Sequence, residues 1–404
     1  MPEVLKLPQF RLLFGGQAVS VVGDALFPVA LAFAVLDDLD GSPAQLGLVL
    51  AAQTLPLAVL ILAAGVWADR VNRRNLMIAS DLGRCAVQAT LATLLLTGDA
   101  ELWHVVALAA LYGTFDAGFQ PALGGLVPIV ATQQHLQQGN AMLGIARNVG
   151  MVAGPTLAGI LIALDGPGTA IAIDAATFAV SAAFLFRLHV RHERPQASEH
   201  HFWRDLKGGI AEVARRRWMW TFMPAFTAYH LLALPCVLAL GPVIADTELS
   251  GASSWAAIST AFGIGTILGS VLVLRTRPRH PMFGATLAFM VAACQPLIVA
   301  YGGSTPVIAG LELLTGIAVA YGFTLWETSL GREIPPRALS RVTSLDWFTT
   351  TGAMPIGFAV VAPVAALLGT ETTMLVCGLI VIALCGGALA VGDVRRLQAP
   401  QATP

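Results

Sequence analysis

The most informative stretch of the sequence is Gly65-Val66-Trp67-Ala68-Asp69-Arg70-Val71-Asn72-Arg73-Arg74. An apolar run, Ala44–Trp67, leads into it and another begins at Leu76, so its charged side chains stand in a connection too short to be a domain. Two apolar helices that cross a lipid bilayer, joined by a turn that stays in water, would produce this pattern. The stretch therefore predicts a helical hairpin in a membrane.

Composition extends this prediction to the whole chain. Of its 404 residues, 56% are hydrophobic and only 12% are charged. Soluble domains carry about 25% charged residues, and a soluble chain of this length could not cover its surface with so few. All five cysteines lie in apolar runs without a C-x-x-C pair. This favours packing roles for them over disulfides or metal binding.

A membrane-crossing helix needs about 20 mostly apolar residues. Twelve such segments occur, and no segment calls for a strand, so we predict an all-α membrane protein with twelve transmembrane helices. The predicted spans are Leu12–Leu36, Ala44–Trp67, Leu76–Leu96, Leu102–Val127, Ala141–Leu164, Thr169–Leu188, Trp218–Val243, Ser253–Leu274, Met282–Tyr301, Thr305–Thr328, Val342–Leu368 and Thr373–Val391.

Lysines and arginines are concentrated on one side of this topology. They gather near Lys6–Arg11, in the connections that follow even-numbered spans, in the central connection and in the C-terminal tail. Arg84 and Arg147 lie a few turns inside their spans, and connections on the opposite side, such as Asp37–Pro43, contain no lysine or arginine. The positive-inside rule then predicts that both termini are cytoplasmic.

An internal repeat appears at an offset of 207 residues. The matching pairs are Pro28 with Pro235, Arg70 with Arg277, Pro128 with Pro335 and Gly150 with Gly357. Such a duplication predicts two six-helix bundles related by a pseudo-twofold axis. The predicted parts are an N-terminal bundle at 1–188, a cytoplasmic linker at 189–217 whose later part is suited to a basic interfacial helix, a C-terminal bundle at 218–393 and a cytoplasmic tail at 394–404.

The spacing G-x-x-x-D-R-x-x-R-R from Gly65 to Arg74 resembles the loop between helices 2 and 3 of major facilitator superfamily transporters. The resemblance covers essentially the whole chain. Its motifs are most similar to those of the bacterial exporter branch that includes the enterobactin exporter and drug or metabolite efflux proteins. This resemblance implies a cytoplasmic gate in which Asp69 lies against the start of helix 11, where a carboxylate meets the positive end of the helix dipole. The residues expected at this gate are Gly65, Asp69, Arg70, Arg73, Arg74, Asp346 and Glu327.

A second motif lies in the fifth span, where Gly150, Gly154, Pro155 and Gly159 follow the spacing G-x-x-x-G-P-x-x-x-G. It resembles the exporter-associated motif of the same family. Glycines permit close helix contact, and proline removes a backbone hydrogen bond. Ordinary packing of small residues is the alternative explanation.

Ionisable residues inside the spans are candidates for transport chemistry, because each costs at least a few kcal/mol in lipid unless it is paired or hydrated. Asp24 and Asp116 lie near the midplane of spans 1 and 4. In the family that this chain resembles, helices 1, 4, 7 and 10 line the central cavity. We expect either carboxyl to carry a proton or contact substrate, with Arg147 or Arg84 as a charge partner of Asp116. A structural hydrogen-bonded carboxyl is the alternative for each.

His230 and Glu312 are further candidates for proton coupling or substrate contact, in spans 7 and 10. Asp81 and Arg84, three residues apart, predict a local ion pair, whereas Asp174 is expected to reach water near the outer surface. Helix 4 lacks the arginine that several proton-coupled exporters carry there. The aromatic candidates for lining the cavity are Phe27, Phe115, Phe119, Tyr229 and Trp326. A place in the core or against lipid is the alternative for most of them.

These observations predict a secondary transporter rather than an enzyme. No G-x-x-x-x-G-K-[ST] loop occurs, so ATP is not the direct energy source. Nor does the sequence contain an evident nucleophile–base pair or metal cluster, so we expect no cofactor and no metal. We expect proton-coupled efflux of a drug-like or natural-product molecule by alternating access. Uptake by a proton symporter, or a scaffold or receptor without transport, are the alternatives.

The expected partners are a small-molecule substrate, protons and the lipid bilayer, without nucleic acid, and the chain is expected to be a monomer. The resemblance places it in the bacterial cytoplasmic membrane as a multi-pass protein.

Overall fold

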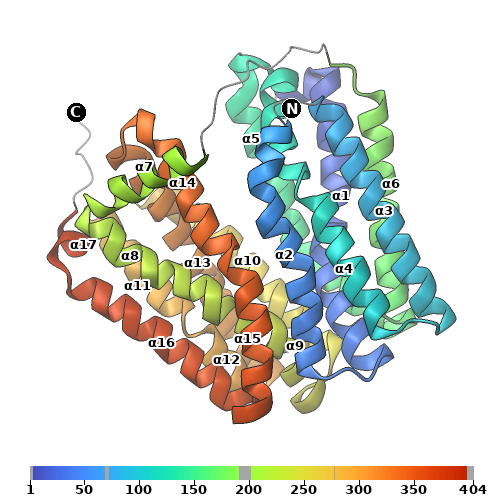
Figure 1. Cartoon of the computed structure of the whole chain (residues 1–404). Coiled ribbons are helices and arrows are strands. Elements are labelled where there is room, and N and C mark those ends of the chain that lie inside the picture. Colours follow the sequence, from blue (N-terminus) through green and yellow to red (C-terminus); the bar gives the residue numbers. More distant parts are fainter. Residues whose placement is uncertain (1–2, 69–71, 191–201, 277, 398–404) are drawn as a thin grey trace. The chain divides into compact units, whose positions relative to one another are not determined.

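The computed structural model describes residues 3–68, 72–190, 202–276 and 278–397, and every regular element in these ranges is a helix (Figure 1). The helices are α1 Pro8–Phe33, α2 Pro43–Ala68, α3 Arg73–Thr97, α4 Leu102–Asp116, α5 Phe119–Asp165, α6 Pro167–Arg187, α7 Phe202–Ala214, α8 Arg217–Ala228, α9 Leu234–Glu248, α10 Ala252–Arg275, α11 Pro281–Ala292, α12 Gln295–Tyr301, α13 Thr305–Glu333, α14 Pro336–Thr351, α15 Ala353–Leu368, α16 Thr370–Ala390 and α17 Gly392–Arg396. A 3-10 helix covers Glu3–Lys6, and π-helical segments cover Ala34–Asp38 and Tyr229–Ala233.

Eleven helices in the described ranges are long and apolar enough to cross a membrane. Helix α3, which coincides with the predicted third span, is not among them, because Asp81, Arg84 and Gln88 lower its hydropathy. The prediction of an all-helical membrane protein is confirmed. One membrane segment, Leu102–Thr132, is built from α4 and the start of α5, and α5 is kinked at Thr132, where φ is 57°.

The repeat of 207 residues is also visible in the helix bounds. Adding 207 to both ends of α2 gives 250–275, and α10 spans Ala252–Arg275. Equivalent glycines make equivalent contacts: a Cβ on Gly150 would lie 2.6 Å from the carbonyl oxygen of Val21, and one on Gly357 would clash with the carbonyl of Leu231. In each repeat, therefore, glycine lets two helices approach to backbone contact.

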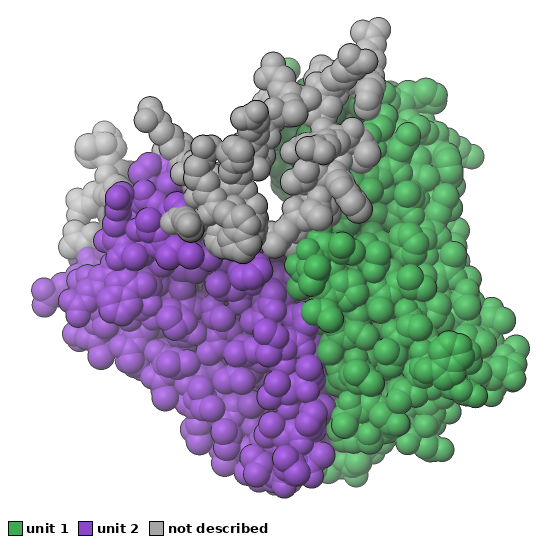
Figure 2. Space-filling view, in the orientation of Figure 1, with its two compact units in different colours: residues 1–198, 245–260 green, residues 199–244, 261–404 purple. Residues whose placement is uncertain are grey.

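The chain forms two compact units, coloured separately in Figure 2. Unit 1 comprises residues 1–198 and 245–260, and unit 2 comprises residues 199–244 and 261–404. Within unit 1, the hydroxyl oxygens of Thr156 on α5 and Thr260 on α10 are hydrogen-bonded at 2.9 Å. The boundaries predicted for the two bundles therefore stay a prediction.

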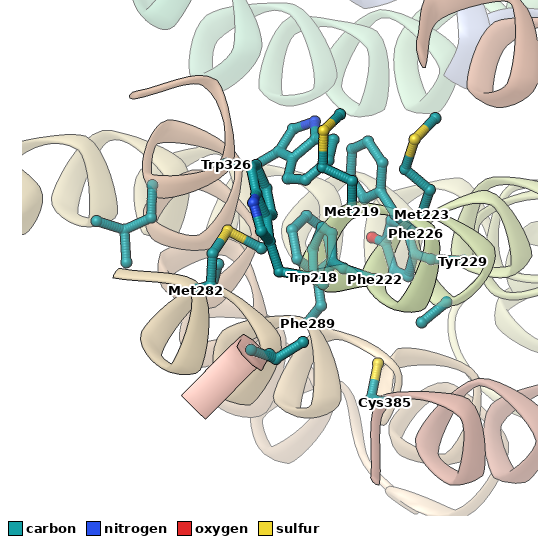
Figure 3. Close-up of a cluster of buried hydrophobic side chains, with 14 of the residues drawn as sticks. Trp218, Met219, Phe222, Met223, Phe226, Tyr229, Met282, Phe289, Trp326 and Cys385 are labelled. Atoms are coloured by element: carbon teal, nitrogen blue, oxygen red, sulfur yellow. The ribbon is translucent and has the colours of Figure 1, made fainter. Parts of the chain in front are cut away.

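Within unit 1, α1 packs against α5 and α6, α3 packs against α6, and α2 packs against α4. Within unit 2, α11 packs against α13, and α16 packs against α8, α11 and α12. A cluster of buried aromatic and sulfur-containing side chains fills unit 2, with Trp218, Phe222, Phe226 and Trp326 in mutual ring contact (Figure 3).

This packing contradicts the expected aromatic lining of a cavity. Phe27 and Phe119 are buried in unit 1, and Tyr229 and Trp326 are buried in unit 2. The physical reason is that aromatic rings bury large apolar areas and dominate cores, so their position in a span does not identify a cavity wall. Of the five aromatics, Phe115 is the one that is only partly buried.

Candidate functional site

Four charged side chains meet inside unit 1, around the guanidinium of Arg84. Its Nη2 donates to Oδ1 of Asp81 at 2.6 Å. Its Nη1 donates to Oδ1 of Asp24 at 3.3 Å and to Oδ1 of Asp116 at 3.1 Å. Three helices thus contribute: α1 carries Asp24, α3 carries Asp81 and Arg84, and α4 carries Asp116. One cation is shared by three carboxyl groups, so the group can accept at least one further positive charge.

Aromatic rings complete the surroundings of Arg84. Its guanidinium carbon lies 4.4 Å from the ring centre of Phe119 and 4.2 Å from that of Phe178. These are cation–π distances, which compensate part of the cost of burying the charge. The hydroxyl of Tyr112 donates to Oδ1 of Asp24 at 3.2 Å.

The members of this group differ in their accessibility. The side chains of Arg84 and Asp81 are 1% and 0% exposed, whereas those of Asp24 and Asp116 are 35% and 27% exposed. A carboxylate at this depth in a membrane helix is far costlier against lipid than against water or a polar ligand. The accessible sides of Asp24 and Asp116 are therefore the part of the group that a proton or a substrate can reach.

The local sequence explains this geometry. Asp81 and Arg84 are three residues apart and lie on one face of α3. Helix α4 ends at Asp116, and α5 begins at Phe119 after a two-residue break. Gly83 lets the ring of Phe115 approach α3, since a Cβ there would overlap the ring. Broken membrane helices that expose backbone at mid-depth are frequent at transporter binding sites.

Of the two expected charge partners, Arg84 and Arg147, the structure places Arg84 beside the carboxyl groups. Arg84 contacts both Asp24 and Asp116, whereas Arg147 is exposed and makes no hydrogen bond or ion pair with the described residues. The predicted local pair of Asp81 and Arg84 is present. Arg84 also takes the place of the arginine that helix 4 lacks, because it brings a cation from α3 to Asp116 of α4.

Asp174 corrects one expectation. It was expected to reach water, but it is fully buried, and its Oδ2 accepts a hydrogen bond from Nε2 of Gln88 at 2.8 Å. Depth along a span does not reveal which face a residue takes, and Asp174 faces α3 rather than solvent. Sequence reasoning missed Gln88, although one signal was present: Gln88 lies 207 residues before Gln295, at the repeat offset.

The two candidates in unit 2 occupy different surroundings. His230 lies in the π-helical segment Tyr229–Ala233, and its Nδ1 is 2.9 Å from the carbonyl oxygen of Phe226, which fixes Nδ1 as the donor. Glu312 is buried and accepts hydrogen bonds from Gln295 and Thr315. Among the described residues, no hydrogen bond or ion pair joins His230 to Glu312.

The expected gate residues are described only in part. Gly65 lies in α2, while Asp69 and Arg70 lie outside the described residues. Arg73 donates to the carbonyl of Gly125 at 2.9 Å, and Arg74 donates to the carbonyls of Leu185 and Phe186 at 2.8 and 2.7 Å. These two arginines thus bind helix backbone within unit 1.

In unit 2, Asp346 is buried and accepts a hydrogen bond from Nε1 of Trp326 at 3.2 Å. Glu327 is exposed and forms no ion pair with Arg332 in the described part of the chain. The proposed roles of Asp346 and Glu327 at the gate stay predictions.

The motif in the fifth span forms close contacts along α5. Gly150 and Gly154 both face α1, where a Cβ on Gly154 would lie 2.5 Å from Cβ of Ala25. A Cβ on Gly159 would lie 2.5 Å from Cβ of Ala256 on α10. Pro155 lies inside α5. The glycines permit two successive close helix contacts, and the proline withdraws one backbone donor between them.

Comparison with known proteins identifies the family. The family model described as Major Facilitator Superfamily matches residues 13–357. The chain belongs to the major facilitator superfamily. It is therefore a membrane transporter, and members of this superfamily are transporters rather than enzymes.

Two relatives in this superfamily are efflux proteins. The transporter is 24% identical over 400 residues to macrolide efflux protein A of Streptococcus pyogenes, covering 96% of this chain and 97% of the relative. It is 28% identical over 417 residues to the multidrug efflux pump Tap of Mycobacterium tuberculosis, covering 98% and 96%.

Solved structures support the fold alone. A bacterial homologue of the human lysosomal transporter Spinster has a TM-score of 0.75 at 13% identity, with 98% of both chains covered. The nucleoside transporter NupG has a TM-score of 0.72 at 15% identity, covering 96% of this chain and 98% of that one.

Proposed function

We propose that this transporter exports a drug-like or natural-product molecule across the bacterial cytoplasmic membrane by alternating access, in exchange for protons. The observation that carries the proposal is the sharing of Arg84 Nη1 between Asp24 and Asp116. The names of the efflux relatives support the direction of transport and the broad class of substrate. The proposal includes a monomeric protein. It also places both termini in the cytoplasm, as the distribution of basic residues predicts.

Competition for one nitrogen of Arg84 gives the group two arrangements. When a proton binds Asp24, that carboxyl loses its charge and its attraction to the guanidinium, so Nη1 can turn fully to Asp116. A proton on Asp116 has the opposite effect. Because Asp24 is on α1 and Asp116 ends α4, each exchange changes which helix is held to α3.

A positively charged or hydrogen-bonding substrate would compete for the same carboxyls. Its arrival favours the ionised form of Asp24 or Asp116, and so favours proton release. If protons and substrate bind alternately to the same carboxyl groups, one is exchanged for the other across the membrane. Asp81, fully buried against Arg84, would hold the guanidinium in place during both steps.

The proposed latch at the cytoplasmic end belongs to the same cycle. Asp69, placed against the start of the eleventh predicted span (Val342–Leu368), would favour the outward-facing state. This contact would break when the two halves rock. Arg73 and Arg74, bound to helix carbonyls in unit 1, would keep the turn after α2 in place.

The test is transport in everted membrane vesicles that report an internal acid pool with a proton-sensitive dye. Macrolides and lipophilic cations are added outside, and an exporter releases protons as it takes the compound in. We expect Asp24→Asn and Asp116→Asn to reduce the signal at least about tenfold, which corresponds to about 1.4 kcal/mol of lost coupling. Asp99→Asn, at an exposed carboxyl in the connection after α3, is the matched control.

Equal rates in all three variants would remove Asp24 and Asp116 from the mechanism. No dye response to any compound, with the protein folded in the vesicles, would contradict proton exchange. Accumulation in right-side-out vesicles under an inward proton gradient would instead identify an uptake symporter.

A further inference from the structure

A second polar group lies in unit 2, where a directed chain of hydrogen bonds ends at Glu312. The hydroxyl of Tyr229 donates to Oε1 of Gln295 at 2.5 Å, and Nε2 of Gln295 donates to Oε2 of Glu312 at 2.9 Å. The hydroxyl of Thr315 donates to the same oxygen at 2.7 Å. The other oxygen, Oε1 of Glu312, has no hydrogen-bond partner among the described residues, although the side chain is only 2% exposed.

The chain crosses its helices at places where the backbone is irregular. Tyr229 begins the π-helical segment Tyr229–Ala233. Gln295 begins α12 directly after the break at Ala293 and Cys294 that separates it from α11. Helix breaks and π-helical turns in membrane helices are concentrated at functional sites.

Among the described residues, no cationic side chain forms an ion pair with Glu312. Helix α13, which carries it, packs against α11, α12 and α14, and close glycine contacts join it to α10. None of the described ionisable side chains on these elements, on α8 or beside Tyr229 forms an ion pair or hydrogen bond with Glu312. They are Arg217, Tyr229, His230, Arg275, Cys294, Tyr301, Tyr321, Glu327, Arg332, Glu333 and Asp346.

An ionised carboxylate in this position would be buried in a membrane helix without a counter-charge, which costs several kcal/mol. A proton on Oε1 removes that cost and leaves Oε2 free to accept from Gln295 and Thr315, as observed. The closure of the site, at 2% exposed, leaves no room for a larger ligand in this arrangement.

We propose that Oε1 of Glu312 is a second, separate proton-binding site, and that the chain from Tyr229 through Gln295 closes around it when the proton is bound. Loss of the proton would leave an unpaired charge that must reach water or a cation, so it would open the hydrogen-bonded chain from Tyr229 through Gln295 to Glu312. The presence of the proton stands by itself, whereas a part for it in export rests on the proposed function.

Asp174 in unit 1 provides a matched comparison. Gln88 lies at the position equivalent to Gln295 in the repeat and also donates to a buried acid. Asp174 accepts on Oδ2 from Gln88 at 2.8 Å, whereas the hydroxyl of Thr177 donates to the backbone carbonyl of Asp174 at 2.8 Å and lies 3.4 Å from Oδ1. The equivalent amide therefore donates to a buried acid in both repeats.

Infrared difference spectroscopy of the full-length transporter in lipid vesicles tests this proposal without transport. A neutral carboxylic acid has a carbonyl stretch above the amide I band, whereas a carboxylate does not. We expect the acid bands of the wild-type spectrum at neutral pH to include one that is lost in Glu312→Gln, and we expect this band to disappear reversibly as the pH is raised. Asp174→Asn is the control and should leave the titration of that band unchanged.

Two results would overturn the proposal. If Glu312→Gln removes only a carboxylate band, the side chain is ionised and Oε1 holds no proton. If the acid band persists at every pH at which the protein is folded, Glu312 is a permanent structural acid. Should Glu312→Gln fail to fold, Tyr229→Phe serves instead, because removing the first donor should shift the position and titration midpoint of the band, and an unchanged band would refute the link.

The outcomes for the two proposals are distinguishable. The double variant Asp24→Asn, Asp116→Asn should keep the Glu312 band even when export is lost. A titrating band in a protein that exchanges no protons would retain the site and refute the proposed function.

Discussion

The buried pair of Arg84 and Asp81 should couple much more strongly than the partly exposed pair of Arg84 and Asp24. The nitrogen–oxygen distance in the first pair is 2.6 Å, with both side chains at most 1% exposed. At an effective dielectric constant of about 20, the attraction at this distance has an upper limit of about 6 kcal/mol. Desolvation opposes it, so we expect a measured coupling free energy of about 2–3 kcal/mol.

The second pair is longer, at 3.3 Å, and Asp24 is 35% exposed. Solvent screening then reduces the expected coupling to about 1 kcal/mol or less. The assay is a pair of double-mutant cycles, Arg84→Met with Asp81→Asn and Arg84→Met with Asp24→Asn. The free energy of unfolding would be measured in mixed detergent micelles by circular dichroism.

Arg84→Met alone should lower the stability by about 3–5 kcal/mol, because it leaves buried Asp81 without its cation. Adding Asp81→Asn should recover part of this loss, since neither partner then carries an unpaired charge. Additive effects of Arg84→Met and Asp81→Asn, or equal coupling in both cycles, would refute the division of the group into a sealed pair and two accessible carboxyls.

Three further predictions concern packing, capping and pH. Gly154→Ala should destabilise unit 1 by about 1–3 kcal/mol, because the new Cβ would meet Ala25. Gly144→Ala on the same helix should not destabilise it, because a Cβ there would point into open space. Equal losses of stability in the two variants would contradict the close contact. Arg74→Ala should cost about 1 kcal/mol and speed hydrogen exchange in the last turn of α6, whose carbonyls Arg74 binds, whereas exposed Arg11→Ala should leave that turn unchanged. A hydrogen bond from Arg216 lowers the pKa of Glu212. The stabilisation that this bond gives to the end of α7 should therefore be complete above the pKa of glutamate in the unfolded chain, and it should be lost as the pH falls through the lower pKa of Glu212 in the folded protein. Hydrogen exchange at the end of α7 should show this loss in the wild type and not in Glu212→Gln.

Much of the fold could be predicted because a membrane leaves little choice. Apolar runs of sufficient length must be helices in lipid, so the spans could be placed from composition alone. The repeat offset could be found from prolines and glycines, since these residues mark bends and close contacts. The same offset links Gln88 to Gln295, but their acid partners do not match at this offset, because Asp174 corresponds to Val381 and Glu312 to Val105.

The site could be predicted only in part. Asp24 and Asp116 were found because charge is rare at that depth, but the choice of Arg84 over Arg147 required the contacts between α1, α3 and α4. Asp174 and the buried aromatics were misplaced for a related reason. Their position along a span gave depth, while the face of the helix decides between water, lipid and protein.

The sequence by itself determined that the chain is a helical membrane protein with a duplicated set of spans, because hydropathy and basic residues respond to the bilayer one segment at a time. It also identified the charged turn Gly65–Arg74 and the acids inside the spans. The sharing of Arg84 by three carboxyl groups, and the oxygen of Glu312 that has no hydrogen-bond partner among the described residues, could be found only from the packing of the helices. Those features depend on side chains from different helices meeting within hydrogen-bond distance, a condition that no single segment encodes.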